Sequence, residues 1–172
     1  MEISAICPIE DHLINVIIET PLGSRNKFDY DQKLKLFRLK KTLPVGSVFP
    51  FDFGFVPNTL ADDGDPIDVL VIMDQPGFMG CLVQCRAIGI IEAEQKEKGG
   101  KKERNDRIVA ISACSILYKD IKSVKELNKQ MVAEIEHFFM DYNRHEGKEF
   151  KPLKWADGDT ALKLIKKQTV LE

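Results

Sequence analysis

The hydrophobic pattern of this chain changes from a period of two to a helical period about two thirds of the way along its 172 residues. Segments that alternate apolar with polar residues, or run apolar between turn residues, are typical of strands. Many short strands of this kind favour a closed or nearly closed β-barrel. The segments expected to be strands are residues 15–19, 27–31, 33–39, 68–73, 81–92 and 107–114.

Two helices are expected in the last third of the chain. Apolar residues recur at helical spacing over residues 124–142, and Ser123 with Glu126 has the pattern of a capping box. A second helix is expected from about residue 160 to 168, with Asp159 as its N-cap. Strands followed by helices, without repeats or linkers, predict an α+β fold.

The composition fits one globular domain over residues 1–172. The chain is 44% hydrophobic with a net charge of -2, which excludes disorder, and it contains no apolar run of about twenty residues. The N-terminal segment is interrupted by charges, unlike a signal peptide. These features predict a cytoplasmic protein without a membrane partner. Its cysteines lack CxxC spacing and are expected to be small core residues: Cys7, Cys81, Cys85 and Cys114.

Residues 62–68 crowd four carboxylates between an aromatic and an apolar stretch. Carboxylates this close repel one another, and a bound cation removes the repulsion. Asp-Gly and Pro predict a turn that feeds a buried strand, so Asp63, Asp65 and Asp68 can aim at one point. Oxygen ligands favour Mg2+, with Mn2+ as a possible substitute, and the spacing excludes an EF-hand loop. The alternative is a solvated surface loop.

Two further groups of charges bear on this cluster. Residues 94–107 are mostly charged and predict a solvated hairpin tip, or alternatively a source of carboxylates that complete the metal site. Basic residues beside an acidic cluster point to a phosphate ligand, because metals and cations together neutralise phosphate oxygens. The basic residues are Lys27, Arg38, Lys40, Lys41, Arg104, Arg107, Arg144 and Lys148.

Several segments together resemble the soluble family I inorganic pyrophosphatases. Residues 63–68, DGDPID, match the family signature D-G-D-P-x-D, and the resemblance extends in family order over roughly residues 14–165. It implies a small five-stranded OB-like β-barrel with flanking helices. It also implies Mg2+-dependent hydrolysis of pyrophosphate to two phosphates, and a homo-oligomer, most often a hexamer. The other matching segments are residues 17–21, 27–31, 49–57, 108–110 and 137–142.

The resemblance also implies roles for individual residues. Asp65 would take a proton from the attacking water. The lysine that follows Tyr142 in the family is Asn143 here, so Arg144 is expected to supply that cation. Carried over by motif, the metal ligands are Asp63, Asp65 and Asp68, the other acids of the site are Glu19 and Asp29, and the substrate-binding residues are Lys27, Lys41, Tyr142 and Arg144.

Other positions depart from the family pattern. Phe49 and Phe53 stand where relatives commonly have tyrosines, which indicates a divergent subgroup with weaker activity. Lys41 replaces an arginine and loses its bidentate geometry. Asn105 falls at a metal-ligand position, for which the adjacent Asp106 is the expected substitute. The acid that usually lies five residues earlier has three candidates: Glu94, Glu97 and Glu103.

Two other functions stay open on the sequence alone. The first is an OB-like nucleic-acid-binding module, in which aromatics of residues 49–55 stack bases, although the neighbouring carboxylates and the net charge of -2 oppose it. The second is a degenerate homologue that binds phosphate or metal without turnover. Retention of Asp65 argues against that function, because binding alone needs no proton acceptor. We therefore expect pyrophosphate, and no nucleic acid, as the partner.

Overall fold

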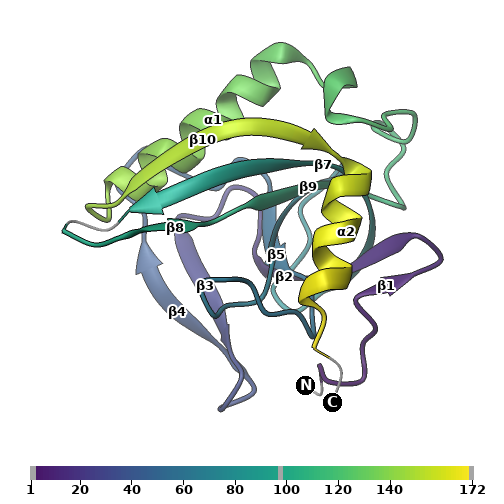
Figure 1. The fold of residues 1–172 in the computed structure, drawn as a ribbon, viewed down its shortest axis with the longest axis horizontal. Helices are drawn as coiled ribbons and strands as arrows, with labels where there is room; N and C mark the ends of the chain where they lie inside the picture. Colours follow the sequence, from purple (N-terminus) through teal and green to yellow (C-terminus); the bar gives the residue numbers. More distant parts are fainter. Residues whose placement is uncertain (1–2, 97–98, 171–172) are drawn as a thin grey trace.

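The computed structural model describes residues 3–96 and 99–170, and a ring of five strands lies at its centre (Figure 1). The pairing of the last ring strand with the first closes the ring. The predicted α+β fold is confirmed, although the ring is not even enough to be called a barrel. In pairing order the ring strands are β2 (Leu13–Thr20), β5 (Asp52–Phe55), β6 (Asp68–Ile72), β9 (Arg107–Ser112) and β7 (Leu82–Lys96).

Shorter strands extend this ring. β7 has several partners because it is long and its register against β9 shifts between Ala87 and Gly89. Its far end forms a hairpin with β8, as predicted for residues 94–107, of which 97–98 lie outside the described residues. The added strands are β1 (Ile9–Glu10) on β2, and β8 (Lys102–Arg104) and β10 (Glu149–Asp157) on β7; β3 (Asn26–Asp31) and β4 (Leu36–Thr42) form a separate sheet.

The predicted helix over residues 124–142 is wrong at its start. A short 3-10 helix, η1 (Val124–Glu126), comes first, and α1 (Lys129–Arg144) follows. Ser123 caps η1, and Leu127 then takes an extended conformation with φ -66° and ψ 148°. Asn128 therefore becomes the N-cap of α1, because its side chain accepts the backbone N–H two residues on.

The second helix, α2 (Gly158–Gln168), is capped by Asp157 and not by Asp159. The Asp157 carboxylate accepts the backbone N–H of Thr160 at 2.9 Å. In the part of the chain that the structure describes, no helix is long and apolar enough to cross a membrane.

Several strands were missed or misplaced in sequence, among them the ring strand β5, whose residues 52–55 were not expected to form a strand. β10 was not predicted, because Pro152 and neighbouring lysines hide its alternation, and the register of the strand shifts between Pro152 and Lys154. β4 begins at Leu36 and not at residue 33, since Asp31 accepts the backbone N–H groups of Lys33 and Leu34 in a turn.

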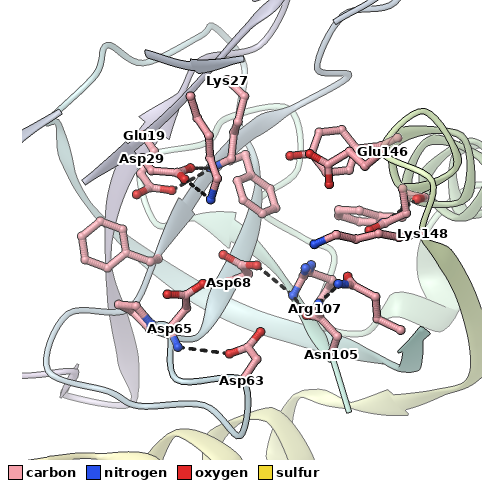
Figure 2. A pocket seen from close by; sticks show the side chains of 18 of the residues that line it. Glu19, Lys27, Asp29, Asp63, Asp65, Asp68, Asn105, Arg107, Glu146 and Lys148 are labelled. Atoms are coloured by element: carbon pink, nitrogen blue, oxygen red, sulfur yellow. Dashed lines mark hydrogen bonds and ion pairs between the residues drawn. The ribbon is translucent and has the colours of Figure 1, made fainter. Parts of the chain in front are cut away.

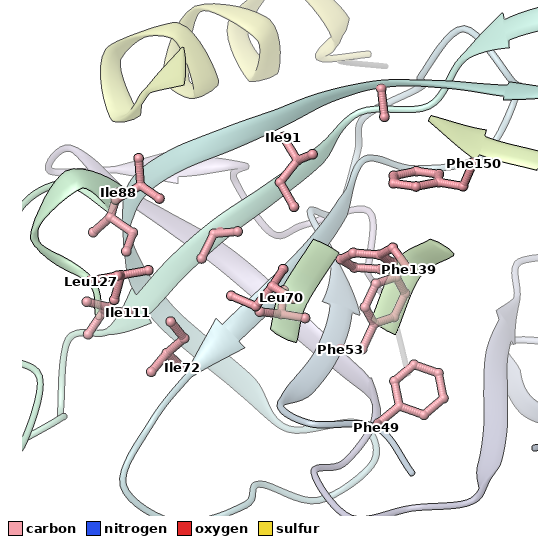
Figure 3. Packing of buried hydrophobic residues seen from close by; sticks show 14 of the residues in the cluster. Phe49, Phe53, Leu70, Ile72, Ile88, Ile91, Ile111, Leu127, Phe139 and Phe150 are labelled. Atoms are coloured by element: carbon pink, nitrogen blue, oxygen red, sulfur yellow. The ribbon is translucent and has the colours of Figure 1, made fainter. Parts of the chain in front are cut away.

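Alternate residues of β6 feed two apolar clusters. Leu70 and Ile72 join the cluster that includes Phe139 of α1 (Figure 3). Val69 and Val71 join the cluster that α2 covers. A strand buried on both faces has a continuous apolar sequence, which explains the run after the acidic segment.

The cysteine prediction holds for one residue. Cys85 is buried in the core, and burial raises the pKa of its thiol. Cys7 and Cys114 are exposed and Cys81 is half-buried, so they are not core residues as predicted. The difference arises because both exposed cysteines lie outside the strands.

Gly54 marks the closest approach of β5 to β2. A Cβ there would lie 2.0 Å from the carbonyl oxygen of Ile17, a backbone atom of the ring. Because the strands must separate to admit it, we expect Gly54→Ala to lower the free energy of unfolding by at least about 3 kcal/mol. Gly77→Ala is the control, since its Cβ would meet only the flexible end of Met73 at 3.0 Å among close atoms. Urea denaturation compares the two, and equal stabilities would contradict the expectation.

Candidate active site

A cavity of about 380 Å³ opens between the ring, the β3–β4 sheet and the end of α1 (Figure 2). Acidic side chains enter it from β2, β3, the segment that leads into β6, β8 and the turn after α1. Basic side chains enter from β3, β4, β9 and the turn after α1. The predicted site residues that line it are Glu19, Lys27, Asp29, Asp63, Asp65, Asp68 and Tyr142.

A tight turn presents the acidic segment to the cavity. Gly64 has φ +88°, and Asp63 Oδ1 accepts the backbone N–H of Asp65 at 3.2 Å. Ile67 anchors the end of the turn, because its side chain is buried and its N–H donates to the Thr59 hydroxyl at 3.0 Å. Local turn chemistry thus places three carboxylates at one edge of the cavity.

Lys27 is a buried cation at the opposite edge. Its Nζ lies 3.0 Å from Glu19 Oε2 and 2.8 Å from Asp29 Oδ1, and its side chain is 8% exposed. Glu19 is fixed in turn, because its other oxygen accepts the N–H of Tyr30 at 2.7 Å. Burial opposes the charge of Lys27, but the carboxylates around it, those of Glu19, Asp29 and Asp68, outweigh burial and raise its pKa.

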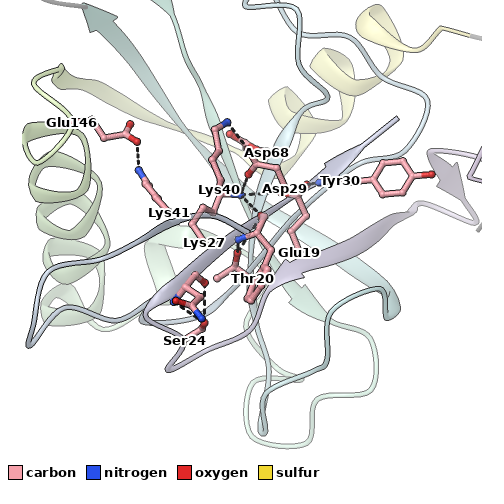
Figure 4. Close-up of polar contacts among 12 residues, drawn as sticks. Glu19, Thr20, Ser24, Lys27, Asp29, Tyr30, Lys40, Lys41, Asp68 and Glu146 are labelled. Carbon is pink, nitrogen blue, oxygen red and sulfur yellow. Dashed lines mark hydrogen bonds and ion pairs between the residues drawn. The ribbon is translucent and has the colours of Figure 1, made fainter. Parts of the chain in front are cut away.

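The register of the β3–β4 sheet gives the neighbouring residues Lys40 and Lys41 different surroundings. Lys27 pairs with Lys41 and Phe28 with Leu39, so a bulge falls at Lys40. Lys40 lines the cavity and contacts Asp29 (Figure 4).

Lys41, predicted to bind substrate, lies outside the cavity lining. Its Nζ contacts Glu146 and lies 3.5 Å from the ring centroid of Tyr142. Burial lowers the pKa of Lys41, and Glu146 opposes that effect. Burial also raises the pKa of Tyr142.

Arg107 forms the third charged group of the cavity. Its Nη1 lies 2.8 Å from Asp68 Oδ2 and contacts Oδ1 of Asn105. Asn105 donates to Gln95 Oε1 at 2.7 Å. Burial raises the pKa of Asp68, and the charges of Arg107 and Lys27 oppose that rise.

Asp106 and Arg144 do not reach this cavity. Asp106 turns to the other side of the strand, where its carboxylate accepts the N–H of Ala93 and lies 2.9 Å from Arg104. These two contacts, formed in the short link between β8 and β9, hold the Asp106 carboxylate outside the cavity lining. Arg144 is exposed and pairs with Asp141 at 2.8 Å.

Sequence reasoning listed Lys148 only among the basic residues, without a role at the site, and it missed Gln95. Lys148 reaches the cavity because Gly147, with φ +71°, turns the chain back after α1. Of the three candidate acids, Glu103 lines the cavity, Glu94 pairs with Lys102 at 3.2 Å, and Glu97 lies outside the described residues. Gln95 pairs with Glu103 across the β7–β8 hairpin, and both are reached by counting every second residue along 89–105. Such a count would have found Gln95 in the sequence.

The aromatic residues of the cavity belong to the core. Phe49, Phe53 and Phe55 are at most 4% exposed, and Phe49 packs edge-on against Phe138 and Tyr142. Buried rings offer no free face to a nucleic-acid base. The arrangement therefore favours core packing over base stacking.

The donor chemistry of the cavity fits hard cations, although its acids do not converge. Among the described residues, no three His, Cys, Asp or Glu side chains are arranged to hold a metal ion. Asp63, Asp65 and Asp68 nevertheless share one edge and offer oxygen ligands of the kind that Mg2+ prefers. Carboxylates that face several basic side chains across one cavity are typical of the class of proteins that act on phosphate compounds with the help of divalent metals.

The comparisons narrow this class. The inorganic pyrophosphatase family model matches residues 16–170, and the chain belongs to family I of the soluble inorganic pyrophosphatases. It is 42% identical over 153 residues to an inorganic pyrophosphatase from Synechocystis, covering 89% of this chain and 88% of that protein.

A plant protein and a solved structure are also similar. Soluble inorganic pyrophosphatase 1 from Arabidopsis thaliana is 36% identical over 160 residues, covering 93% of this chain and 73% of that protein. The crystal structure of the inorganic pyrophosphatase from Thermus thermophilus superposes with a TM-score of 0.87 at 28% identity, covering 98% of this chain and 97% of that chain. The relation thus holds in sequence and in fold.

Proposed function

We propose that this inorganic diphosphatase hydrolyses pyrophosphate with Mg2+ held by Asp63, Asp65 and Asp68, and with Asp65 as the proton acceptor for the attacking water. The observation that supports the proposal is the placement of these carboxylates across one cavity from several basic side chains (Figure 2). Bound Mg2+ would screen the phosphate charge and lower the pKa of water. Mn2+ has the same preference for oxygen ligands and is the expected substitute.

The basic side chains would hold the phosphate oxygens. Lys27 carries a charge fixed by its two acids, and Lys40 and Lys148 line the same cavity. Tyr142 would add a hydroxyl donor. In this proposal Lys40 and Lys148 take the roles that the sequence suggested for Lys41 and Arg144. Glu19 and Asp29 support the site by orienting Lys27.

Phosphate release from pyrophosphate by purified protein tests the function directly. We expect turnover with Mg2+, less with Mn2+ and none with EDTA. Asp68→Asn should lose most turnover, because it removes a proposed metal ligand. A folded protein that binds Mg2+ without releasing phosphate would instead favour the degenerate homologue that binds without catalysis.

The two phenylalanines define the proposed divergent subgroup. Phe49 and Phe53 line the cavity at positions where the family commonly has tyrosines. We expect Phe49→Tyr to raise kcat/KM about two- to tenfold, because one hydrogen bond contributes roughly 0.5–1.5 kcal/mol. Steady-state kinetics of Phe49→Tyr and Phe49→Leu would test the hydroxyl against a simple change in packing. Equal activity of both variants with the wild type would contradict the subgroup proposal.

We also propose that residues 1–172 act as one catalytic domain in a cytoplasmic homo-oligomer, which we expect to be a hexamer. Large exposed apolar side chains support association, and Phe78, Ile116 and Leu117 are each at least 69% exposed. Light scattering coupled to size exclusion would measure the oligomeric state. A monomer at micromolar concentration would overturn this part of the proposal.

A further inference from the structure

Backbone register holds Arg107 beside Asp68. β6 and β9 are parallel, with Val69 opposite Ile108, so the residues that precede this pair enter the ring at the same level. The 2.8 Å contact between Arg107 Nη1 and Asp68 Oδ2 follows from this register (Figure 2). The ion pair is therefore a product of the fold and not of one side-chain rotamer alone.

Neutral amides hold the guanidinium in place. Nη1 of Arg107 also contacts Asn105 Oδ1 and donates to the Asp106 carbonyl oxygen at 3.2 Å. Asn105 is itself fixed by Gln95 at 2.7 Å. Because amides carry no charge, the ion-pair partner of the Arg107 guanidinium is the Asp68 carboxylate.

The guanidinium keeps unused hydrogen-bonding capacity. Arg107 is 8% exposed, and within the described residues its Nε is buried without an acceptor. A buried N–H without an acceptor is costly and is relieved when an acceptor becomes available. Phosphate oxygens are acceptors that suit the planar donor fork of arginine.

A divalent ion at Asp68 competes with this guanidinium for the carboxylate. Two cations in contact with one carboxylate repel each other strongly in a partly buried site. The Asp68 side chain is 24% exposed, so only partial screening by water is available. Metal affinity at Asp68 is then reduced by whatever free energy the ion pair contributes.

We propose that Arg107 is a built-in competitor of the divalent ion at Asp68, and that metal binding moves its guanidinium from Asp68 to the substrate phosphate. The inference rests on the proposed function, since it takes Asp68 as a metal ligand. It adds a coupling between binding of the metal ion and binding of the substrate. Metal occupancy at Asp68 and the availability of an arginine for the substrate become one event.

Calorimetric titration of Mg2+ without pyrophosphate measures the competition. We expect Arg107→Gln to bind Mg2+ at least about tenfold more tightly than the wild type, a difference of about 1.4 kcal/mol. Arg104→Gln removes an equal charge from a residue paired with Glu92 and Asp106 outside the cavity, and it should stay within twofold. Arg107→Lys keeps the positive charge, so its affinity for Mg2+ should not increase. Equal tightening in Arg104→Gln, or none in Arg107→Gln, would overturn the proposal.

The wild-type protein supplies a second test, in which a variant serves only to assign one resonance. The 15N resonance of Arg107 Nε, assigned by its loss in Arg107→Lys, should shift during the Mg2+ titration and shift again when inorganic phosphate is added. If the chemical shift of this resonance does not change with Mg2+, the inference is overturned even if pyrophosphate is hydrolysed. Conversely, tighter Mg2+ binding in Arg107→Gln together with no turnover in the wild type would refute the proposed function and leave the competition standing.

Discussion

Asp65→Asn should lose pyrophosphate turnover by about 10²–10⁴-fold, the usual contribution of a positioned proton acceptor. The amide has the shape of the carboxylate but cannot accept a proton from water at neutral pH. Asp65 is exposed at the cavity edge, and the turn is held by its backbone N–H and carbonyl groups. The substitution should therefore leave the free energy of unfolding within about 0.5 kcal/mol.

The matched control is Asp62→Asn, which makes the same chemical change in the same segment. Asp62 lies outside the cavity and accepts a weak hydrogen bond from Gln168 at 3.4 Å. Phosphate release at saturating Mg2+, with circular dichroism of both variants, separates chemistry from folding. If Asp65→Asn were as active as Asp62→Asn, another group would have to accept the proton.

The acidic segment was predictable because its causes are local. Asp-Gly and Pro specify a turn, and the apolar run after Asp68 specifies a buried strand. Neither conclusion needs knowledge of distant residues. The structure places Asp63, Asp65 and Asp68 at one edge of the cavity for these reasons.

Residues whose direction depends on register were not predictable. Asp106 was chosen as the charged neighbour of Asn105, but its carboxylate accepts the backbone N–H of Ala93 and pairs with Arg104 outside the cavity. Likewise, because of the bulge at Lys40, the side chain of Lys40 lines the cavity and that of Lys41 does not. A sequence pattern fixes neither the first residue of a strand nor the position of a bulge.

The pairing across the ring was also beyond the sequence. Arg107 meets Asp68 because parallel strands far apart in the chain align in one register. The motif locates Asp68, but nothing in the motif names its partner. Long-range register is decided by packing of both strand faces, which the separate segments do not reveal.

Loss of the buried charge at Lys27 should have the largest effect on stability. Lys27→Met leaves the Glu19 carboxylate buried without its cation, whereas Asp29 keeps its contact with Lys40. Removing one partner of a buried ion pair costs about 3–5 kcal/mol. Lys40→Met is the control, because the Lys40 side chain is 59% exposed and such pairs contribute about 0–1 kcal/mol.

The loss of stability in Lys27→Met should depend on pH in a defined direction. Burial raises the pKa of Glu19, and Lys27 opposes that rise, so Lys27→Met should raise it further. A carboxyl group with a raised pKa in the folded state binds more protons there than in the unfolded state, so stability falls as pH increases. The deficit of Lys27→Met should be larger at pH 8 than at pH 5. Urea unfolding at fixed protein concentration measures it at both pH values. A deficit independent of pH would mean that lost packing, and not the unpaired Glu19 charge, destabilises the variant.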